Sequence, residues 1–237
     1  VRGELALEHR EAGLKVWSKD GGSPVTDADL AVDQLLKDAL LSARPDYGWL
    51  SEETPDDLAR LGHETVFIID PIDGTRAFVA GEEHFAHSLA VARHGVVTAA
   101  VVYLPALDRL YAAAADIAPT VNGARVQAST RQALTGADIL TTKASLQPEK
   151  WPGGVPEVTR HFRASLAYRM CLAAEGSFDG MLTLRPAWEW DIAAGSLIAE
   201  SAGLRVSDRH GARLVFNSAK AQADGVLALP AGPHAQA

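Results

Sequence analysis

Hydrophobic residues in this chain follow helical spacing in some segments and form short continuous runs in others. From Thr26 to Leu40 they recur every three or four positions, which predicts a helix with one buried face. Thr26 is a typical N-cap residue, and Asp29 follows it in capping-box spacing. Further helices are expected at residues 5–17, 166–175 and 191–202.

Runs rich in valine, isoleucine and aromatic residues predict the strands. The turn Asn122-Gly123 is a strong hairpin signal, and a last hairpin turn is expected at residues 209–211. Residues 230–237, with two prolines and a glycine, are expected to form a frayed tail. The predicted strands cover residues 66–69, 85–92, 96–104, 110–112, 120–121, 139–142, 178–184 and 226–229.

The strand predicted at 66–69 leads into the sequence Asp70-Pro-Ile-Asp-Gly-Thr75. Pro71 lacks a backbone donor, so we expect the strand to end there. Two carboxylates at the end of a core strand repel each other, which raises their pKa unless a cation lies between them. Carboxylate oxygens suit a hard ion such as Mg²⁺. The alternative is a plain β-turn, because Asp, Pro and Gly are common turn residues.

Two further acidic stretches could complete such a site. Glu52 and Glu53 are adjacent, and a glutamate pair is ordinarily solvated surface. Asp191 stands where a helix begins, so it is either a capping acid or a further ligand. Trp188 and Trp190 flank this helix start and suggest a semi-enclosed pocket there.

Composition and charge narrow the class of protein. The chain has 237 residues, 47% of them hydrophobic, which is enough for one large domain or two small ones. The net charge of −8 argues against binding a nucleic acid polymer or an anionic membrane. A single cysteine and the lack of a long apolar run predict a cytoplasmic protein without a membrane span.

Three motifs occur in one order along the chain: Leu50-Ser-Glu-Glu53, Asp70-Pro-Ile-Asp-Gly-Thr75 and Trp190-Asp-Ile-Ala-Ala-Gly195. Together they resemble the inositol monophosphatase superfamily of Mg²⁺-dependent, lithium-sensitive phosphatases. Residues 170–176 and 189–191 are most similar to its bacterial 3′(2′),5′-bisphosphate nucleotidase branch. That branch removes a phosphate from adenosine 3′,5′-bisphosphate, which implies a small phosphorylated substrate.

The resemblance implies a layered αβαβα sandwich, with an α+β half at residues 1–130 and an α/β half at residues 131–237. It also implies two or three Mg²⁺ ions, with Mn²⁺ as a substitute and Li⁺ as an inhibitor, in a monomer or homodimer. By the motif match, one metal is held by Glu52, Asp70 and the backbone carbonyl of Ile72, and a second by Asp70, Asp73 and Asp191.

The same resemblance implies the catalytic roles. A metal-activated water attacks the phosphate, and Thr75 and Glu52 orient it and accept its proton. The backbone N–H groups of Gly74 and Thr75 hold the phosphate. Asp29 matches a family acid behind the metals and is counted with the catalytic residues in a supporting role; its alternative role is that of the capping-box acid. Substrate contacts are also assigned to Asp73 and Asp191.

Departures from the family pattern leave the substrate open. Inositol phosphatases carry an acid seven residues before the motif aspartate, and this chain has Leu184 there. If the protein hydrolyses inositol-1-phosphate, we expect Glu189 to replace this acid. Histidinol phosphate and a sugar phosphate are further alternative substrates. The alternative from another class of function is a catalytically silent metal-binding regulator. Four basic residues are candidates to hold a second phosphate: Lys143, Arg163, Arg169 and Lys220. For each of them, an ordinary charged surface residue is the more common role.

Overall fold

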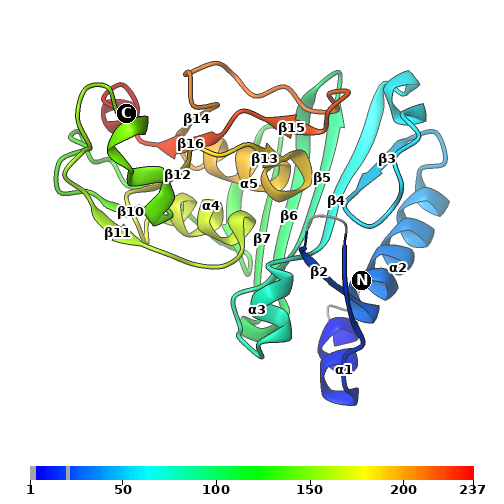
Figure 1. Cartoon of the computed structure of the whole chain (residues 1–237). Coiled ribbons are helices and arrows are strands. Elements are labelled where there is room, and N and C mark those ends of the chain that lie inside the picture. The colour runs from blue at the N-terminus through cyan, green and yellow to red at the C-terminus, as the bar shows by residue number, and fades with distance from the viewer. Residues whose placement is uncertain (1–3, 20–21) are drawn as a thin grey trace.

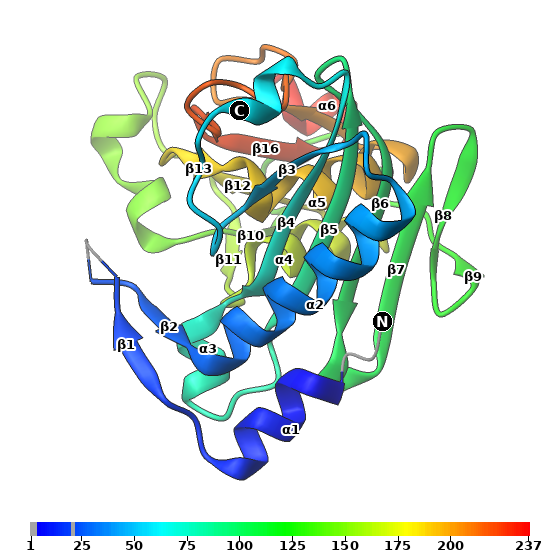
Figure 2. The ribbon, with the colours of Figure 1, turned by 90° about the vertical axis from the view of Figure 1, so that its right-hand side faces the viewer.

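Alternating layers of helix and sheet make up the protein (Figure 1). The computed structural model describes residues 4–19 and 22–237. Helices α4 (Leu166–Ala174) and α5 (Glu189–Ser201) lie between two mixed sheets. Helices α1 (Glu4–Ala12) and α2 (Asp27–Ala43) cover the other face of the larger sheet (Figure 2). The predicted layered α/β fold is confirmed.

The larger sheet has seven strands in chain order, β3 to β9. Only the first pair, β3 and β4, is parallel, and every later neighbour is antiparallel. The strands are β3 (Gly48–Ser51), β4 (Thr65–Asp73), β5 (Ala86–Arg93), β6 (Val96–Leu104), β7 (Arg109–Ala114), β8 (Ile117–Val121) and β9 (Ala124–Arg125).

The smaller sheet has five strands in the order β11-β10-β12-β16-β14. Its strands are β10 (Asp138–Leu140), β11 (Thr159–His161), β12 (Gly180–Thr183), β14 (Arg205–Ser207) and β16 (Val226–Leu229). Two short pairs stand apart from the sheets: β1 (Val16–Ser18) with β2 (Pro24–Thr26), and β13 (Ala187–Trp188) with β15 (Gln222–Ala223). Short helices are α3 (Thr75–Val79) and α6 (Ala231–His234), and 3₁₀ turns lie at Ala59–Gly62, Pro105–Leu107, Lys143–Leu146 and Pro148–Lys150.

Strand β4 is buried on both faces, which explains its continuous apolar run. Phe67 and Ile69 pack in the cluster that α2 covers, whereas Val66 and Ile68 belong to the cluster around α4 and α5. The capping box of Thr26 and Asp29 at the start of α2 is confirmed. Both helical layers therefore hold β4 in place up to its carboxyl end.

Glycine at position 195 lets α5 lie close against α4. A Cβ atom there would lie 2.7 Å from the Cβ of Met170 in α4. Both helices are almost wholly buried, so neither can shift into open space. This contact fixes the helix that carries Asp191.

We therefore expect Gly195→Val to destabilise the fold by about 1–3 kcal/mol, because overpacked cores must displace neighbours. The melting temperature should fall by about 3–10 °C. Gly62→Val is the matched control, since nothing lies within 4 Å of a Cβ at that position. An equal melting temperature for the two variants in thermal unfolding would show that α4 can yield.

Some predicted elements are wrong at their ends. The helix expected at 5–17 ends at Ala12, and residues 16–18 form β1. The turn at 209–211 does not join two strands, because β14 pairs with β16 instead. The expected frayed tail contains α6, where His234 is buried and within hydrogen-bond distance of Ser207 Oγ at 2.7 Å.

The division into halves at residues 130 and 131 stays a prediction. The seven-stranded sheet ends at residue 125 and the five-stranded sheet begins at residue 138. Helix α5 contacts strands of both sheets, so one core runs between them. No helix among residues 4–19 and 22–237 is long and apolar enough to cross a membrane.

Candidate active site

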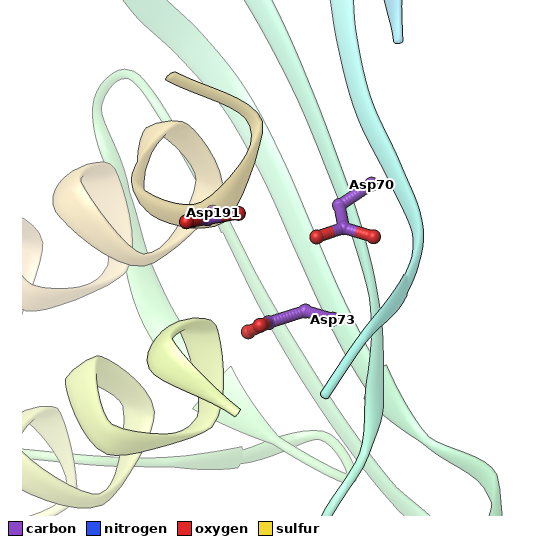
Figure 3. A group of neighbouring side chains, drawn as sticks. All are labelled: Asp70, Asp73 and Asp191. Carbon is purple, nitrogen blue, oxygen red and sulfur yellow. The ribbon is translucent and has the colours of Figure 1, made fainter. Parts of the chain in front are cut away.

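A β-bulge at the end of β4 brings Asp70 and Asp73 to one side of the sheet. In a regular strand, side chains three positions apart point to opposite faces. Here Asp70 pairs with Ser88 and Asp73 with Ala86, so two residues of β4 face one residue of β5. The extra residue shifts the alternation of side chains along β4 by one position. Both carboxyl groups therefore face the same space (Figure 3).

The expectation that Pro71 ends the strand is wrong. Pro71 lies inside β4, in the bulge, where no ladder hydrogen bond from its nitrogen is needed. Its carbonyl oxygen instead contacts Nδ1 of the buried His87, the residue that faces the bulge. His87, which had no predicted role in the site, thus supports the turn between Asp70 and Asp73.

Asp191 reaches the same space from the first turn of α5 (Figure 3). The start of this helix is tied to the larger sheet, because Ser88 Oγ donates a hydrogen bond of 3.0 Å to the carbonyl of Trp190. Asp70, Asp73 and Asp191 each offer one oxygen within 4.8 Å of the others. The structure thus brings together three of the predicted metal ligands.

Helix α4 holds Asp73 with its amino-terminal end. Ser165 Oγ and the backbone N–H of Ala167 both donate to Asp73 Oδ2 at 2.6 Å. Ser165 is the N-cap residue of α4, and the helix dipole favours a negative charge at this end. Ser165 is not among the site residues predicted from sequence, although its place just before the predicted helix was a signal for it.

The three carboxyl groups resist ionisation. Burial and the negative charges around them raise the pKa of Asp70 and of Asp191 well above the usual range. Burial also raises the pKa of Asp73 to about 6, against the opposing effect of the hydrogen bonds from Ser165 and Ala167. A divalent cation among these oxygens would favour the ionised carboxylates and so lower the three pKa values. An all-oxygen ligand set fits Mg²⁺.

Thr75 lies behind this group with its hydroxyl aimed at two acceptors. Its Oγ1 is 3.1 Å from the carbonyl oxygen of Ile72 and 3.4 Å from Asp29 Oδ1. Asp29 is buried, and burial raises its pKa to about 6 despite the hydrogen bonds from Thr26. Asp29 therefore serves the capping box and contacts Thr75 at once.

Gly74, the N-cap residue of α3, has a left-handed backbone conformation with φ of 98°. A Cβ atom there would lie 3.2 Å from the carbonyl oxygen of His84. A side chain would be strained in both respects. The predicted phosphate contacts of its N–H group and that of Thr75 stay predictions.

Glu52 is placed differently from the other predicted ligands. Its carboxylate pairs with Lys19 Nζ at 2.8 Å, and Glu53 pairs with the same ammonium group at 2.6 Å. Glu52 still lies close enough to raise the pKa of Asp70. Burial raises the pKa of Glu53 to about 7, so this glutamate is not the solvated surface residue that was expected. The sequence analysis assigned no role to Lys19.

The candidates for a second phosphate differ in exposure. Lys143 and Lys220 are exposed, and Arg163 is partly buried over the ring of Phe178. Arg169 is buried, and it donates hydrogen bonds to the backbone carbonyls of Arg163 and Ala164. The expectation of a surface charge is therefore wrong for Arg169, which fastens the loop before α4.

Glu189 cannot replace the acid missing at Leu184. Its two carboxylate oxygens accept the backbone N–H groups of Asn217 at 2.6 Å and Ser218 at 2.9 Å. The residue is only 1% exposed, so no substrate hydroxyl can reach it. That expectation for inositol phosphate is wrong.

The comparisons with known proteins agree with this geometry. The model of the "Inositol monophosphatase family" matches residues 2–232. An inositol-1-monophosphatase from Rhizobium meliloti is 34% identical over 213 residues, which cover 84% of this chain and 77% of the relative. The 3′(2′),5′-bisphosphate nucleotidase CysQ of Escherichia coli is 31% identical over 208 residues, which cover 86% of this chain and 83% of the relative.

Solved structures give the same result. An IMPase from Thermotoga maritima matches with a TM-score of 0.84 and 26% identity, over 99% of this chain and 89% of that chain. The similarity thus covers both sheets and the helices between them. The chain belongs to the inositol monophosphatase family and is a metal-dependent phosphatase that acts on phosphate monoesters.

Proposed function

We propose that this protein is a Mg²⁺-dependent phosphatase that removes the 3′-phosphate of adenosine 3′,5′-bisphosphate. The observation that carries the metal dependence is the group of three carboxyl oxygens within 4.8 Å of one another. The choice of substrate is supported by position 184, where a leucine replaces the acid that would contact inositol hydroxyls, while Glu189 is fully engaged elsewhere.

Asp70, Asp73 and Asp191 would hold the cations. Glu52 would join after leaving Lys19, together with the carbonyl oxygen of Ile72. When bound, the cations supply charge neutralisation at the phosphoryl oxygens and an activated water.

Thr75 is suited to orient a nucleophile at this place. With the carbonyl of Ile72 and the carboxyl of Asp29 as acceptors nearby, the hydroxyl can donate its proton to either. A lone pair of the Thr75 oxygen then remains for a proton coming from the nucleophile. Asp29, with a pKa of about 6, can exchange a proton near neutral pH. Together they would move a proton away from the attacking oxygen.

Inositol-1-phosphate is the second candidate substrate, because the Rhizobium meliloti relative named for it has similar identity to this chain. A catalytically silent metal-binding regulator is the candidate from another class. The presence of Glu52, Thr75 and the three aspartates argues against it. A cytoplasmic location and a monomeric or homodimeric state stay predictions.

The test is phosphate release with Mg²⁺ from adenosine 3′,5′-bisphosphate and from inositol-1-phosphate at matched concentrations, with and without Li⁺. We expect a higher kcat/KM for the nucleotide and inhibition by Li⁺ with either substrate. A preference for inositol-1-phosphate would overturn the substrate assignment. Release from neither, with Mg²⁺ still raising the melting temperature, would favour the silent regulator.

A further inference from the structure

Two tryptophans form a stacked pair at the start of α5, one residue before Asp191. The rings of Trp188 and Trp190 have centroids 4.7 Å apart and planes within 8° of parallel. Trp190 packs on the main core, whereas Trp188 keeps 44% of its surface exposed. Part of the Trp188 ring is therefore open to a ligand.

The backbone under Trp188 is rigid. Trp188 pairs with Gln222 in the short β13–β15 ladder, and the next N–H group, of Glu189, donates to the carbonyl of Ala221 at 2.8 Å. Trp190 supports the ring from one side and is itself tied to β5 through Ser88. An aromatic surface fixed in this way loses little conformational entropy when a flat group stacks on it.

The charge beside the pair suits an anionic substrate. Arg185 lies on the same connection between β12 and α5 and is exposed. It is near enough to Asp191 to oppose the raised pKa of that carboxyl. Arg185 thus adds a positive charge to the segment that leads into Asp191, which favours the approach of a phosphate ester.

We propose that Trp188 is the platform on which the purine ring of the substrate stacks while its 3′-phosphate lies at the aspartates. This inference rests on the proposed function and names the residue that selects a nucleotide over inositol phosphate. Base stacking on an aromatic side chain is sequence-tolerant, because it uses the face of the ring and not its edges. The platform thus selects a planar aromatic group, and the aspartates select the phosphate.

The experiment compares wild type, Trp188→Ala and Trp188→Phe with Mg²⁺ present. For each we would measure kcat/KM on adenosine 3′,5′-bisphosphate and on inositol-1-phosphate, and the Kd of the product AMP by titration calorimetry. Trp188→Ala should lower the nucleotide-to-inositol ratio of kcat/KM on the order of 10- to 100-fold and weaken AMP by a similar factor. Trp188→Phe should restore most of both, because it keeps a ring for stacking.

Ile117→Ala is the control, since Ile117 is 64% exposed on β8 and takes part in no proposed site. Equal losses on both substrates in Trp188→Ala would mean that Trp188 only supports the helix start, and would overturn the inference. So would wild-type protein that does not bind AMP, or an AMP affinity that Trp188→Ala leaves unchanged. Failure of the proposed function is distinguishable, because wild type alone would then release phosphate from neither substrate or would prefer inositol-1-phosphate.

Discussion

Changing Asp73 to asparagine is expected to lower Mg²⁺-dependent phosphate release on the order of 10³-fold and to leave the fold intact. Oδ2 of Asp73 is occupied by Ser165 Oγ and the N–H of Ala167. An asparagine carbonyl oxygen can accept the same two hydrogen bonds. The substitution therefore removes a negative charge from the site while keeping the link between β4 and α4.

The measurement is steady-state phosphate release with saturating Mg²⁺, together with thermal unfolding of each variant. Asp116→Asn is the matched control, because Asp116 is exposed in a turn with φ of 66°, where asparagine is well tolerated. Full Mg²⁺-dependent turnover in Asp73→Asn would remove Asp73 from the proposed site. A large drop in melting temperature would instead indicate a structural role.

The residues that make up the site could be predicted from the sequence, but the backbone geometry that brings them together could not. The motif Asp70 to Thr75 and the aspartate at a later helix start were enough to expect three carboxylates together, as the structure shows. The bulge could not be predicted, because it depends on pairing with β5, where His87 faces two residues of β4. The prediction that the strand ends at Pro71, which rested on local rules for proline, was therefore wrong: β4 continues to Asp73.

Pairings between distant parts of the chain explain the other errors. Glu52 was expected to lie free for a metal, but Lys19 comes to it from 33 residues away in the sequence. Glu189 was expected to be available, but the segment at 217–218 binds both of its oxygens. Periodicity and capping rules describe neighbours along the chain, so they carry no information about such partners.

Asp70→Asn is expected to make the metal-free protein more stable at neutral pH, although it should abolish the stabilisation by Mg²⁺. Burial raises the pKa of Asp70 most, and the charges of Glu52, Asp73, Asp191 and Asp29 raise it further. The hydrogen bond that Asp70 accepts from the N–H of Ile72 at 3.0 Å can be kept by an asparagine. We expect a gain of roughly 1–2 kcal/mol, or about 2–8 °C in melting temperature.

The sign of the pH dependence follows from the raised pKa values. A carboxyl group with a raised pKa in the folded state keeps its proton at a pH where the unfolded chain has already released it. Its stabilising contribution is full below the unfolded pKa, near 4, and is lost as the pH rises through the folded pKa, about 6 for Asp73. The melting-temperature gap between Asp70→Asn and wild type should therefore be small near pH 4 and widen as the pH rises toward the raised pKa of Asp70.

Added Mg²⁺ should reverse the order of the two proteins. At 100 to 1,000 times the dissociation constant, a bound ion stabilises the folded state by roughly 2–4 kcal/mol. Wild type would gain this amount and the variant would not, because one of the three carboxylate ligands is missing. Calorimetric unfolding from pH 4 to 8, with EDTA and with Mg²⁺, measures both effects, and Asp116→Asn should follow wild type throughout. A metal-free variant that melts below wild type at every pH would mean that the three carboxyl groups do not repel one another in the folded protein, and the argument for a cation among them would lose its physical basis.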